Sequence, residues 1–186
     1  LASGLAEGGR EGARRTLRTV WEAVQEAGVP DLMRFYPFLR TLGRSSSVAS
    51  LWSPYDFNPL GFDPLRRILE AHIDFARIRA FPDLELLIAA TDVATGTKRL
   101  FRRGELTVEA VLASACLPTI HHAVEIEGRA YWDGGFSANP DLVTLASESP
   151  TGDTLLVLLS PIEQTGIPRT AREIAGEVSR ITFNQP

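Results

Sequence analysis

The stretch that decides the fold is residues 110–142, which read AVLASACLPTIHHAVEIEGRAYWDGGFSANPDL. It opens with small residues that suit a closely packed helix, and Pro118 ends that helix because proline cannot continue it. A hairpin follows, with two apolar arms that turn at Glu127-Gly128. The second arm runs directly into Asp133, so the sequence predicts a carboxylate at the end of a strand.

The chain upstream of this stretch begins with a predicted helix over residues 10–27. Its apolar residues recur at helical period and form one stripe, made of Ala13, Leu17, Val20, Trp21 and Val24. Gly28 stands where a helix commonly stops, and Pro30 follows it. Residues 29–62 are rich in Pro, Gly, Ser and aromatic residues, which predicts an irregular excursion with one short helix near 31–42. Such a segment either pins itself to the core through its aromatic side chains or covers a cleft.

Helices and strands alternate along the rest of the chain. Asp63-Pro64 starts a helix that runs to about Ile73, with aspartate as the cap and proline in the first turn. The other expected elements are a buried strand over 84–90, a turn at Thr95-Gly96 with a return strand to Phe101, a helix over 108–116 capped by Thr107, a short helix opened by Asn139-Pro140, a buried strand over 154–159, and a helix over 171–181 capped by Thr170. This order predicts an α/β layered domain with a largely parallel sheet.

Composition and charge exclude several functional classes. The 186 residues are 44% hydrophobic and 23% charged, which suits one globular domain with a buried core. The formal net charge is −4 with no basic block, so the electrostatic footprint of a nucleic-acid-binding protein is missing. Cys116 is the only cysteine, and no His, Asp or Glu group has ligand spacing. We therefore expect no disulfide within the chain, no metal and no cofactor.

The ends of the chain and its apolar runs bear on location. No apolar run is as long as the ~18 residues that a membrane-spanning helix requires, and no signal segment opens the chain. We expect a cytoplasmic, bacterial-type protein. The chain starts without methionine on LASGLAEGG and ends on ITFNQP, so we expect a piece of a longer protein.

The chemistry of the stretch centres on Asp133 and the two glycines after it. A carboxylate at a strand end can act as a general base or orient one. Gly134 and Gly135 lack side chains, which permits positive φ and the close approach of another backbone or a substrate. An Asp-Gly pair alone is also common in plain turns.

The motifs of residues 90–140 together resemble those of the patatin-like phospholipase family. In chain order they are Ala90-Thr91 at a strand end, Thr95-Gly96 at a turn, the helix Ala113-Ser114-Ala115-Cys116-Leu117-Pro118, Asp133-Gly134-Gly135, and Asn139-Pro140. The resemblance is most specific over 110–142. It extends more weakly back to residues 1–9, which are similar to the helix that leaves the family's nucleophile turn, and forward through residues 154–183.

This resemblance implies a fold and an activity. The fold is a three-layer α/β/α domain, here N-terminally truncated, with residues 1–186 as one partial domain that includes the 29–62 excursion. The activity is that of a serine hydrolase that cleaves acyl esters, often of lipids, through a Ser-Asp dyad. Asp133 takes the role of the base, and Gly134 and Gly135 complete its motif. The implied partner is a lipid or another acyl ester, with a peripheral membrane contact allowed and no particular oligomeric state indicated.

The nucleophile that the resemblance implies is not in this chain. No G-x-S-x-G occurs among the 186 residues. Ser3-Gly4 lacks the preceding glycine and the strand. The family also has a glycine-rich oxyanion loop, which supplies backbone N–H groups to the oxyanion and comes before the nucleophile turn. Gly8-Gly9 lies after the expected position of that turn, so it does not match this loop. We therefore expect the serine and the oxyanion loop to lie upstream of Leu1, and the chain alone to be inactive.

Other side chains near the motif are weaker candidates. His121-His122 invites a Ser-His-Asp triad, but a pair between a proline and a hairpin more often packs or lines a cleft. Tyr131 shares the strand face of Asp133 and is a further candidate for cleft lining. Cys116, in a helix of small residues, is expected to be a buried packing residue.

Two alternatives to the hydrolase remain open from the sequence. The first is a truncated or degenerate relative that binds lipid or a partner without catalysis. The second is an unrelated α/β domain in which Asp133 is structural, either buried against a helix N-terminus or exposed in a turn. The residues encoded before Leu1 separate the hydrolase from the non-catalytic relative, because a strand followed by G-x-S-x-G supports catalysis.

Overall fold

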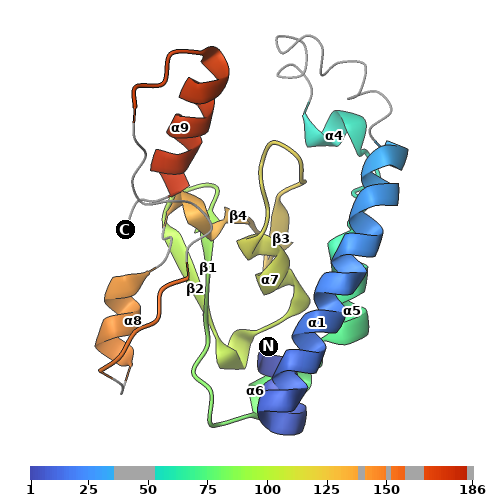
Figure 1. Cartoon of the computed structure of the whole chain (residues 1–186), viewed down its shortest axis with the longest axis vertical. Helices are drawn as coiled ribbons and strands as arrows, with labels where there is room; N and C mark the ends of the chain where they lie inside the picture. Colours follow the sequence, from blue (N-terminus) through green and yellow to red (C-terminus); the bar gives the residue numbers. More distant parts are fainter. Residues whose placement is uncertain (36–52, 138–140, 150–151, 158–165, 184–186) are drawn as a thin grey trace.

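The computed structural model describes residues 1–35, 53–137, 141–149, 152–157 and 166–183, with only the backbone described at 28–35, 57, 172, 179, 182 and 183. Figure 1 shows a small central sheet with helices on either side. The elements in chain order are α1 (Ala2–Phe35), α4 (Pro54–Phe57), α5 (Pro64–His72), α6 (Phe75–Ala80), β1 (Leu87–Asp92), β2 (Lys98–Arg102), η1 (Arg103–Glu105), α7 (Val108–Ser114), β3 (Val124–Ile126), β4 (Arg129–Asp133), η2 (Gly134–Phe136), α8 (Leu142–Glu148) and α9 (Ala171–Phe183).

The sheet has four strands in the order β2-β1-β4-β3, and each described pair is antiparallel. The prediction of a largely parallel sheet is therefore wrong for the described residues. Two tight turns explain two of the three pairs, β1–β2 and β3–β4, because a short loop can join only antiparallel neighbours. Gly96, at φ 68°, lies in the turn between β1 and β2, and Glu127 and Gly128, at φ 52° and 77°, form the turn between β3 and β4. Both turns stand where the sequence predicts them.

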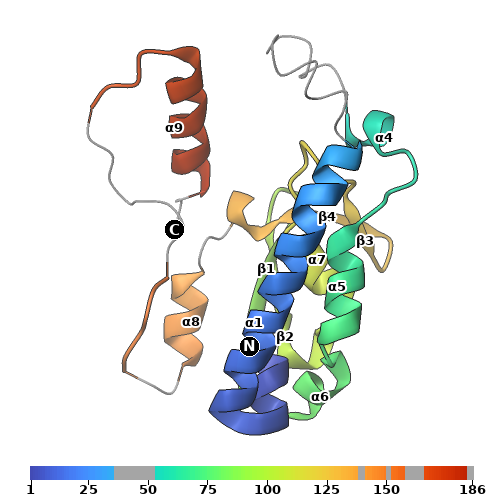
Figure 2. The ribbon, with the colours of Figure 1, turned by 45° about the vertical axis from the view of Figure 1, so that its right-hand side comes forward.

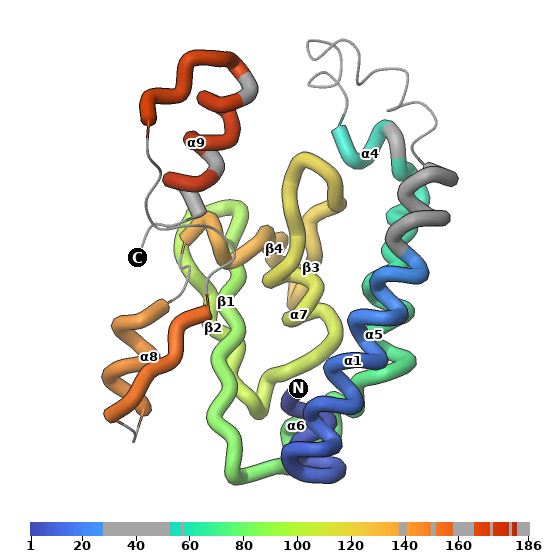
Figure 3. The backbone as a smooth tube through the Cα atoms, in the orientation of Figure 1, coloured from blue at the N-terminus to red at the C-terminus, as the bar shows by residue number. Residues whose placement is uncertain are grey.

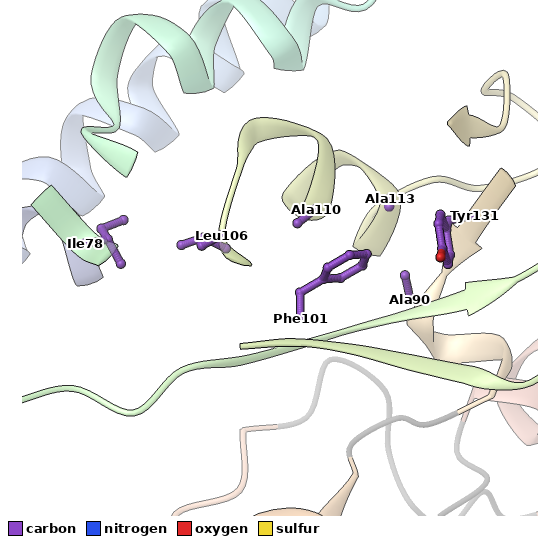
Figure 4. Close-up of a cluster of buried hydrophobic side chains, with 7 residues drawn as sticks. All are labelled: Ile78, Ala90, Phe101, Leu106, Ala110, Ala113 and Tyr131. Carbon is purple, nitrogen blue, oxygen red and sulfur yellow. The ribbon is translucent and has the colours of Figure 1, made fainter. Parts of the chain in front are cut away.

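The hydrophobic core lies between the sheet and α7. Its buried members are Ile78, Ala90, Phe101, Leu106, Ala110, Ala113 and Tyr131. The rings of Phe101 and Tyr131 meet edge to face, with centroids 5.7 Å apart, and Figure 4 shows them between the strands and the small residues of α7. Such pairs are worth about 0.5–1.5 kcal/mol beyond the area that they bury. Alanines at 110 and 113 let the helix approach the sheet closely.

Helices flank the sheet on both sides, which gives the α/β/α layering that the resemblance implies. Helix α7 lies on one face, with α1, α5 and α6 beyond it, whereas α8 lies on the other side of β1 and β2 in two views (Figures 1 and 2). Three of the predicted caps are in place. The side chain of Asp63 accepts from Leu65 and Arg66 at the start of α5, Thr107 accepts from Ala110 at the start of α7, and Thr170 accepts from Glu173 at the start of α9.

Helix α1 differs from its prediction at both ends. It begins at Ala2, breaks at Gly8 and Gly9, and continues through Gly28 to Phe35 despite the backbone hydrogen bond that Pro30 cannot donate. The chain doubles back at the break, as Figure 3 shows. A Cβ on Gly4 would lie 2.3 Å from the carbonyl oxygen of Gly12, so the two arms pack backbone to backbone and only glycine fits there.

The remaining differences lie in the excursion and in the C-terminal part of the chain. The short helix expected near 31–42 falls partly within α1, and residues 36–52 lie outside the described residues. The buried strand expected over 154–159 is wrong for its described part: residues 154–157 are irregular, and Leu155 is 90% exposed. An apolar run forms a strand only where a partner strand is available. Helix α8 begins after Asp141, whose side chain accepts from Thr144, and Asn139-Pro140, expected to open this helix, lie outside the described residues.

Candidate functional site

Asp133 ends strand β4 on the face that carries α7. Side chains alternate along a strand, so Asp133 shares the face of Tyr131, which is buried in the core. The register pairs Asp133 with Ala90 of β1. The backbone N–H of Asp133 donates to the carbonyl oxygen of Cys116, at 2.9 Å, which ties the strand end to the segment that follows α7.

The two oxygens of the Asp133 carboxylate have different surroundings. Oδ1 accepts a hydrogen bond from the backbone N–H of Gly135, at 2.7 Å. Oδ2 has no hydrogen-bond partner among the described residues, and the side chain is half-buried. Burial raises the pKa of Asp133 above its ordinary value, and the Gly135 N–H opposes that rise. One oxygen is thus held in place while the other is left to accept a proton.

The two glycines of the motif serve close packing and hydrogen bonding. A Cβ on Gly134 would lie 2.4 Å from the carbonyl oxygen of Ala89, a distance that no side chain tolerates. Gly135 is buried and supplies the N–H for Asp133. Neither glycine is among the residues at positive φ. Of the two reasons that the sequence offers for these glycines, close approach holds for Gly134, and positive φ is wrong for both.

A cavity of about 460 Å³ adjoins the Asp133 motif. The walls come from β1 and β2 (Leu87, Ile88, Ala89, Leu100), from α7 and its end (Val111, Ser114, Ala115), from the motif (Asp133, Gly134, Gly135), and from the region of α8 (Asp141, Leu145). Most of these groups are apolar or small. A half-buried carboxylate therefore faces a space that could admit an apolar acyl group.

The edge of β1 is open beside this cavity. Strand β4 pairs with β1 only at residues 90–92, whereas β2 pairs with it from residue 87 onward. Residues 87–89 thus have a strand partner on one side only among the described elements, although Gly134 lies against the carbonyl oxygen of Ala89, and all three line the cavity. An unpaired strand edge is a template for another strand.

His121 and His122 line a different cavity, of about 210 Å³. A ring nitrogen of His121 accepts from the backbone N–H of Leu117, at 3.1 Å. The ring of His122 stacks on Tyr55, with centroids 4.1 Å apart, and its Nε2 lies 3.2 Å from the carbonyl oxygen of Pro54. These contacts join the loop after α7 to α4. Neither histidine is among the residues that line the Asp133 cavity, which does not favour a triad.

Two further candidates from the sequence lie in the core. Tyr131 is 4% exposed and lines neither of the two cavities. Cys116 is also buried, and its Sγ donates to the carbonyl oxygen of His122, at 3.1 Å. Burial raises the pKa of the Cys116 thiol to about 11, so it stays protonated and unreactive at neutral pH. The structure thus places Cys116 as a packing residue.

The structure also brings together polar residues to which the sequence analysis assigns no role in the site. Ser114 and Asp141 line the Asp133 cavity, and Thr91 donates from β1 to the carbonyl oxygen of Asp133. The side chain of Asp141 forms an ion pair with Lys98, at 2.6 Å, which lowers its pKa to about 2. Only the tertiary packing of strands and helices reveals these neighbours, because they come from β1, α7 and the start of α8.

The structure also bears on metal binding and on membrane insertion. Within the described ranges, no three His, Cys, Asp or Glu side chains are grouped so that they could hold a metal ion. In the same part of the chain, no helix combines the length and the apolar character that crossing a membrane requires.

Comparison with known proteins connects this geometry to a family. The family model described as patatin-like phospholipase matches residues 10–146, roughly three quarters of the chain. The match contains the whole sheet and the Asp133 motif. A comparison with curated proteins found no match.

Proposed function

Because the chain belongs to the patatin-like phospholipase family, whose members are lipolytic acyl hydrolases, we propose that it carries the base of a Ser-Asp dyad. Asp133 is that base, and the serine lies outside the 186 residues. The observation that carries the proposal is the state of the carboxylate: one oxygen is fixed by Gly135, and the other is unpaired beside a cavity.

The proposed reaction is ester hydrolysis in two steps. In the first step, the serine hydroxyl attacks the ester carbonyl carbon while Oδ2 of Asp133 accepts the hydroxyl proton. The tetrahedral intermediate collapses, the alcohol leaves with that proton, and an acyl-serine remains. In the second step, water gives a proton to Asp133 and attacks the acyl-serine. As this second intermediate collapses, Asp133 returns the proton to the serine oxygen, which restores the serine hydroxyl and releases the fatty acid. The raised pKa of Asp133 makes it a stronger base than an exposed aspartate.

The open edge of β1 supports a location for the missing nucleophile. A strand paired with β1 beside Leu87 and Ile88 would extend the sheet beside the Asp133 cavity. A turn at the end of such a strand would bring a serine hydroxyl close to the carboxylate. We therefore place the serine-bearing strand on this edge.

The lipid substrate brings a partner into the proposal. Acyl esters of phospholipids are held in a bilayer, so hydrolysis requires at least a transient contact with that surface. The walls of the Asp133 cavity include Leu87, Leu100 and Leu145, side chains that suit an acyl chain. We propose a peripheral contact of this kind.

The proposal is tested by Asp133→Asn in the full-length protein, with a p-nitrophenyl ester as substrate. The expected result is a fall in kcat of about 10²- to 10⁴-fold, the usual contribution of a general base. Asp83→Asn is the matched control, because Asp83 is exposed and lines neither cavity. Ester turnover that is equal in the two variants would remove Asp133 from the mechanism.

The absence of G-x-S-x-G from the 186 residues favours a second candidate function, a relative that binds lipid without catalysis. A fluorophosphonate probe separates the two, because it labels an activated serine and not a binding protein. Labelling of the full-length protein supports the hydrolase. Binding to phospholipid vesicles without labelling or turnover supports the second candidate.

A further inference from the structure

A pair of hydroxyl groups connects strand β1 to both ends of the turn that follows Asp133. Thr91 lies on β1 and is 5% exposed. Its Oγ1 is 2.7 Å from the carbonyl oxygen of Asp133 and 2.7 Å from Oγ of Ser137. Asp133 immediately precedes the turn Gly134–Phe136, and Ser137 immediately follows it.

The direction of these hydrogen bonds is fixed by the number of protons. A carbonyl oxygen can only accept, so the single hydroxyl proton of Thr91 goes to Asp133. Ser137 must then donate its own proton to Thr91 Oγ1. The result is a directed chain from Ser137 through Thr91 to Asp133, in which each bond polarises the next.

These two hydrogen bonds close the turn Gly134–Phe136, which fixes the position of the Asp133 carboxylate. The backbone N–H of Ser137 also donates to the carbonyl oxygen of Gly134, at 3.0 Å. Gly135 lies inside the closed turn, and its N–H is the donor that holds Oδ1 of Asp133. The hydroxyl pair therefore acts on the carboxylate through the backbone, without touching it.

We propose that Thr91 and Ser137 are positioning residues for Asp133. They hold the turn Gly134–Phe136 so that Gly135 keeps Oδ1 and the other carboxylate oxygen stays available to a substrate. The catalytic role of the two hydroxyls rests on the proposed function. Their effect on the turn and on the Asp133 carboxyl depends only on the 186 residues of this chain.

A merely structural role makes a different prediction. A buried hydroxyl in a strand needs a partner in any protein, and its loss lowers stability. A positioning role requires in addition that the loss reach the carboxylate. Without the hydroxyl pair the turn loosens, the Gly135 N–H leaves Oδ1, and the ionised form of Asp133 loses its one described donor. The titration of Asp133 is the readout that separates the two roles.

The charged and titratable groups around Asp133 do not obscure this titration. Cys116, in the segment after α7, has a pKa of about 11. Asp141, before α8, has a pKa of about 2 and is paired with Lys98 of β2. The Cys116 thiol titrates far above an aspartate carboxyl and the Asp141 carboxyl below it, whereas the pKa of Asp133 is raised, so the charges of both neighbours stay constant while Asp133 titrates.

The experiment is a ¹³C NMR titration of the Asp133 carboxyl in this chain. Thr91→Val keeps the shape of the side chain and removes the hydroxyl, and we expect the titration midpoint to rise by about half a pH unit. Thr91→Ser keeps a hydroxyl and should restore the original midpoint. Ser137→Ala leaves Thr91 in place and should raise the midpoint by a smaller amount. Ile78→Val, a core change remote from the turn, controls for the loss of stability.

The full-length protein supplies the second readout. Thr91→Val should lower kcat for the p-nitrophenyl ester by about tenfold and leave KM unchanged, because alignment of the base is lost and binding is not. An unchanged midpoint in a folded Thr91→Val variant, or the same midpoint shift in Ile78→Val, would overturn the positioning role. If the midpoint shifts while Asp133→Asn keeps full turnover, the positioning role of Thr91 and Ser137 is confirmed and the assignment of Asp133 as the hydrolase base is wrong.

Discussion

The His121–His122 loop precedes the β3–β4 hairpin, and the Asp133 motif ends it. The two regions differ in the surroundings of their titratable side chains. In the loop, one histidine ring accepts from Leu117, and the other stacks on Tyr55 and contacts Pro54. In the motif, the carboxylate makes one hydrogen bond and keeps one oxygen unpaired among the described residues. Each histidine also keeps one ring nitrogen without a hydrogen-bond partner among the described residues. The difference lies in the surroundings, because Asp133 lines the cavity beside β1 and α7 and neither histidine does.

The largest effect is expected from a side chain in the tight turn at Gly134. In Gly134→Ala, the new Cβ would lie 2.4 Å from the carbonyl oxygen of Ala89, so β1 and the turn must separate. We expect a loss of about 3 kcal/mol in the free energy of unfolding, measured by urea denaturation. Gly104→Ala is the control, because no atom lies within 4 Å of its Cβ. If both variants unfold at the same urea concentration, the close packing described at Gly134 is wrong.

The His121–His122 loop is expected to contribute to stability and not to catalysis. His122→Ala removes the stack on Tyr55 and the contact with Pro54, so we expect a loss of about 1–2 kcal/mol in stability. Because His122 does not line the Asp133 cavity, kcat of the full-length protein should stay at the wild-type value. A fall in kcat of about 100-fold or more, in a variant that remains folded, would instead support a triad.

The smallest expected effect concerns the stability cost of Asp133 itself. Its pKa is raised in the folded chain, so the folded state binds the proton more tightly than the unfolded state does. Stability therefore falls as pH rises from the ordinary aspartate value of about 3.9 through the raised value, and the cost is complete above that window. Asp133→Asn removes this cost and should raise Tm slightly at pH 7.

The same variant should have no advantage at pH 3.5, where the wild-type carboxyl is protonated. Thermal unfolding at the two pH values measures the difference, with Asp83→Asn as the control. A lower Tm for Asp133→Asn at pH 7 would mean that the carboxylate stabilises the fold, contrary to its partial burial.

Local signals predicted much of this fold. Asp63 and Thr107 cap the helices that the sequence assigns to them, and the Glu127–Gly128 turn places the hairpin correctly. Each of these features depends on residues within a few positions of one another. The end of a strand at Asp133 follows from the hairpin in the same way.

Features that depend on distant partners could not be predicted. The antiparallel pairing of β1 with β4 joins Ala90 to Asp133, and the residues between them carry no signal for it. The Thr91–Ser137 contact depends on that same register. Residues 154–157 show the opposite case, because their apolar pattern predicts a strand and the described structure offers no partner for one.

The free oxygen of Asp133 is proposed to accept the serine proton, and this transfer takes place in the acylation step of the full-length protein. The burst of p-nitrophenol in the first turnover measures that step. We expect the burst rate to rise with pH through the raised pKa of Asp133, because only the ionised carboxyl accepts a proton. In Asp133→Asn this dependence should disappear, with a rate lower by about 10²-fold or more. A burst with the wild-type rate and the wild-type pH dependence in Asp133→Asn would show that Asp133 is not the base.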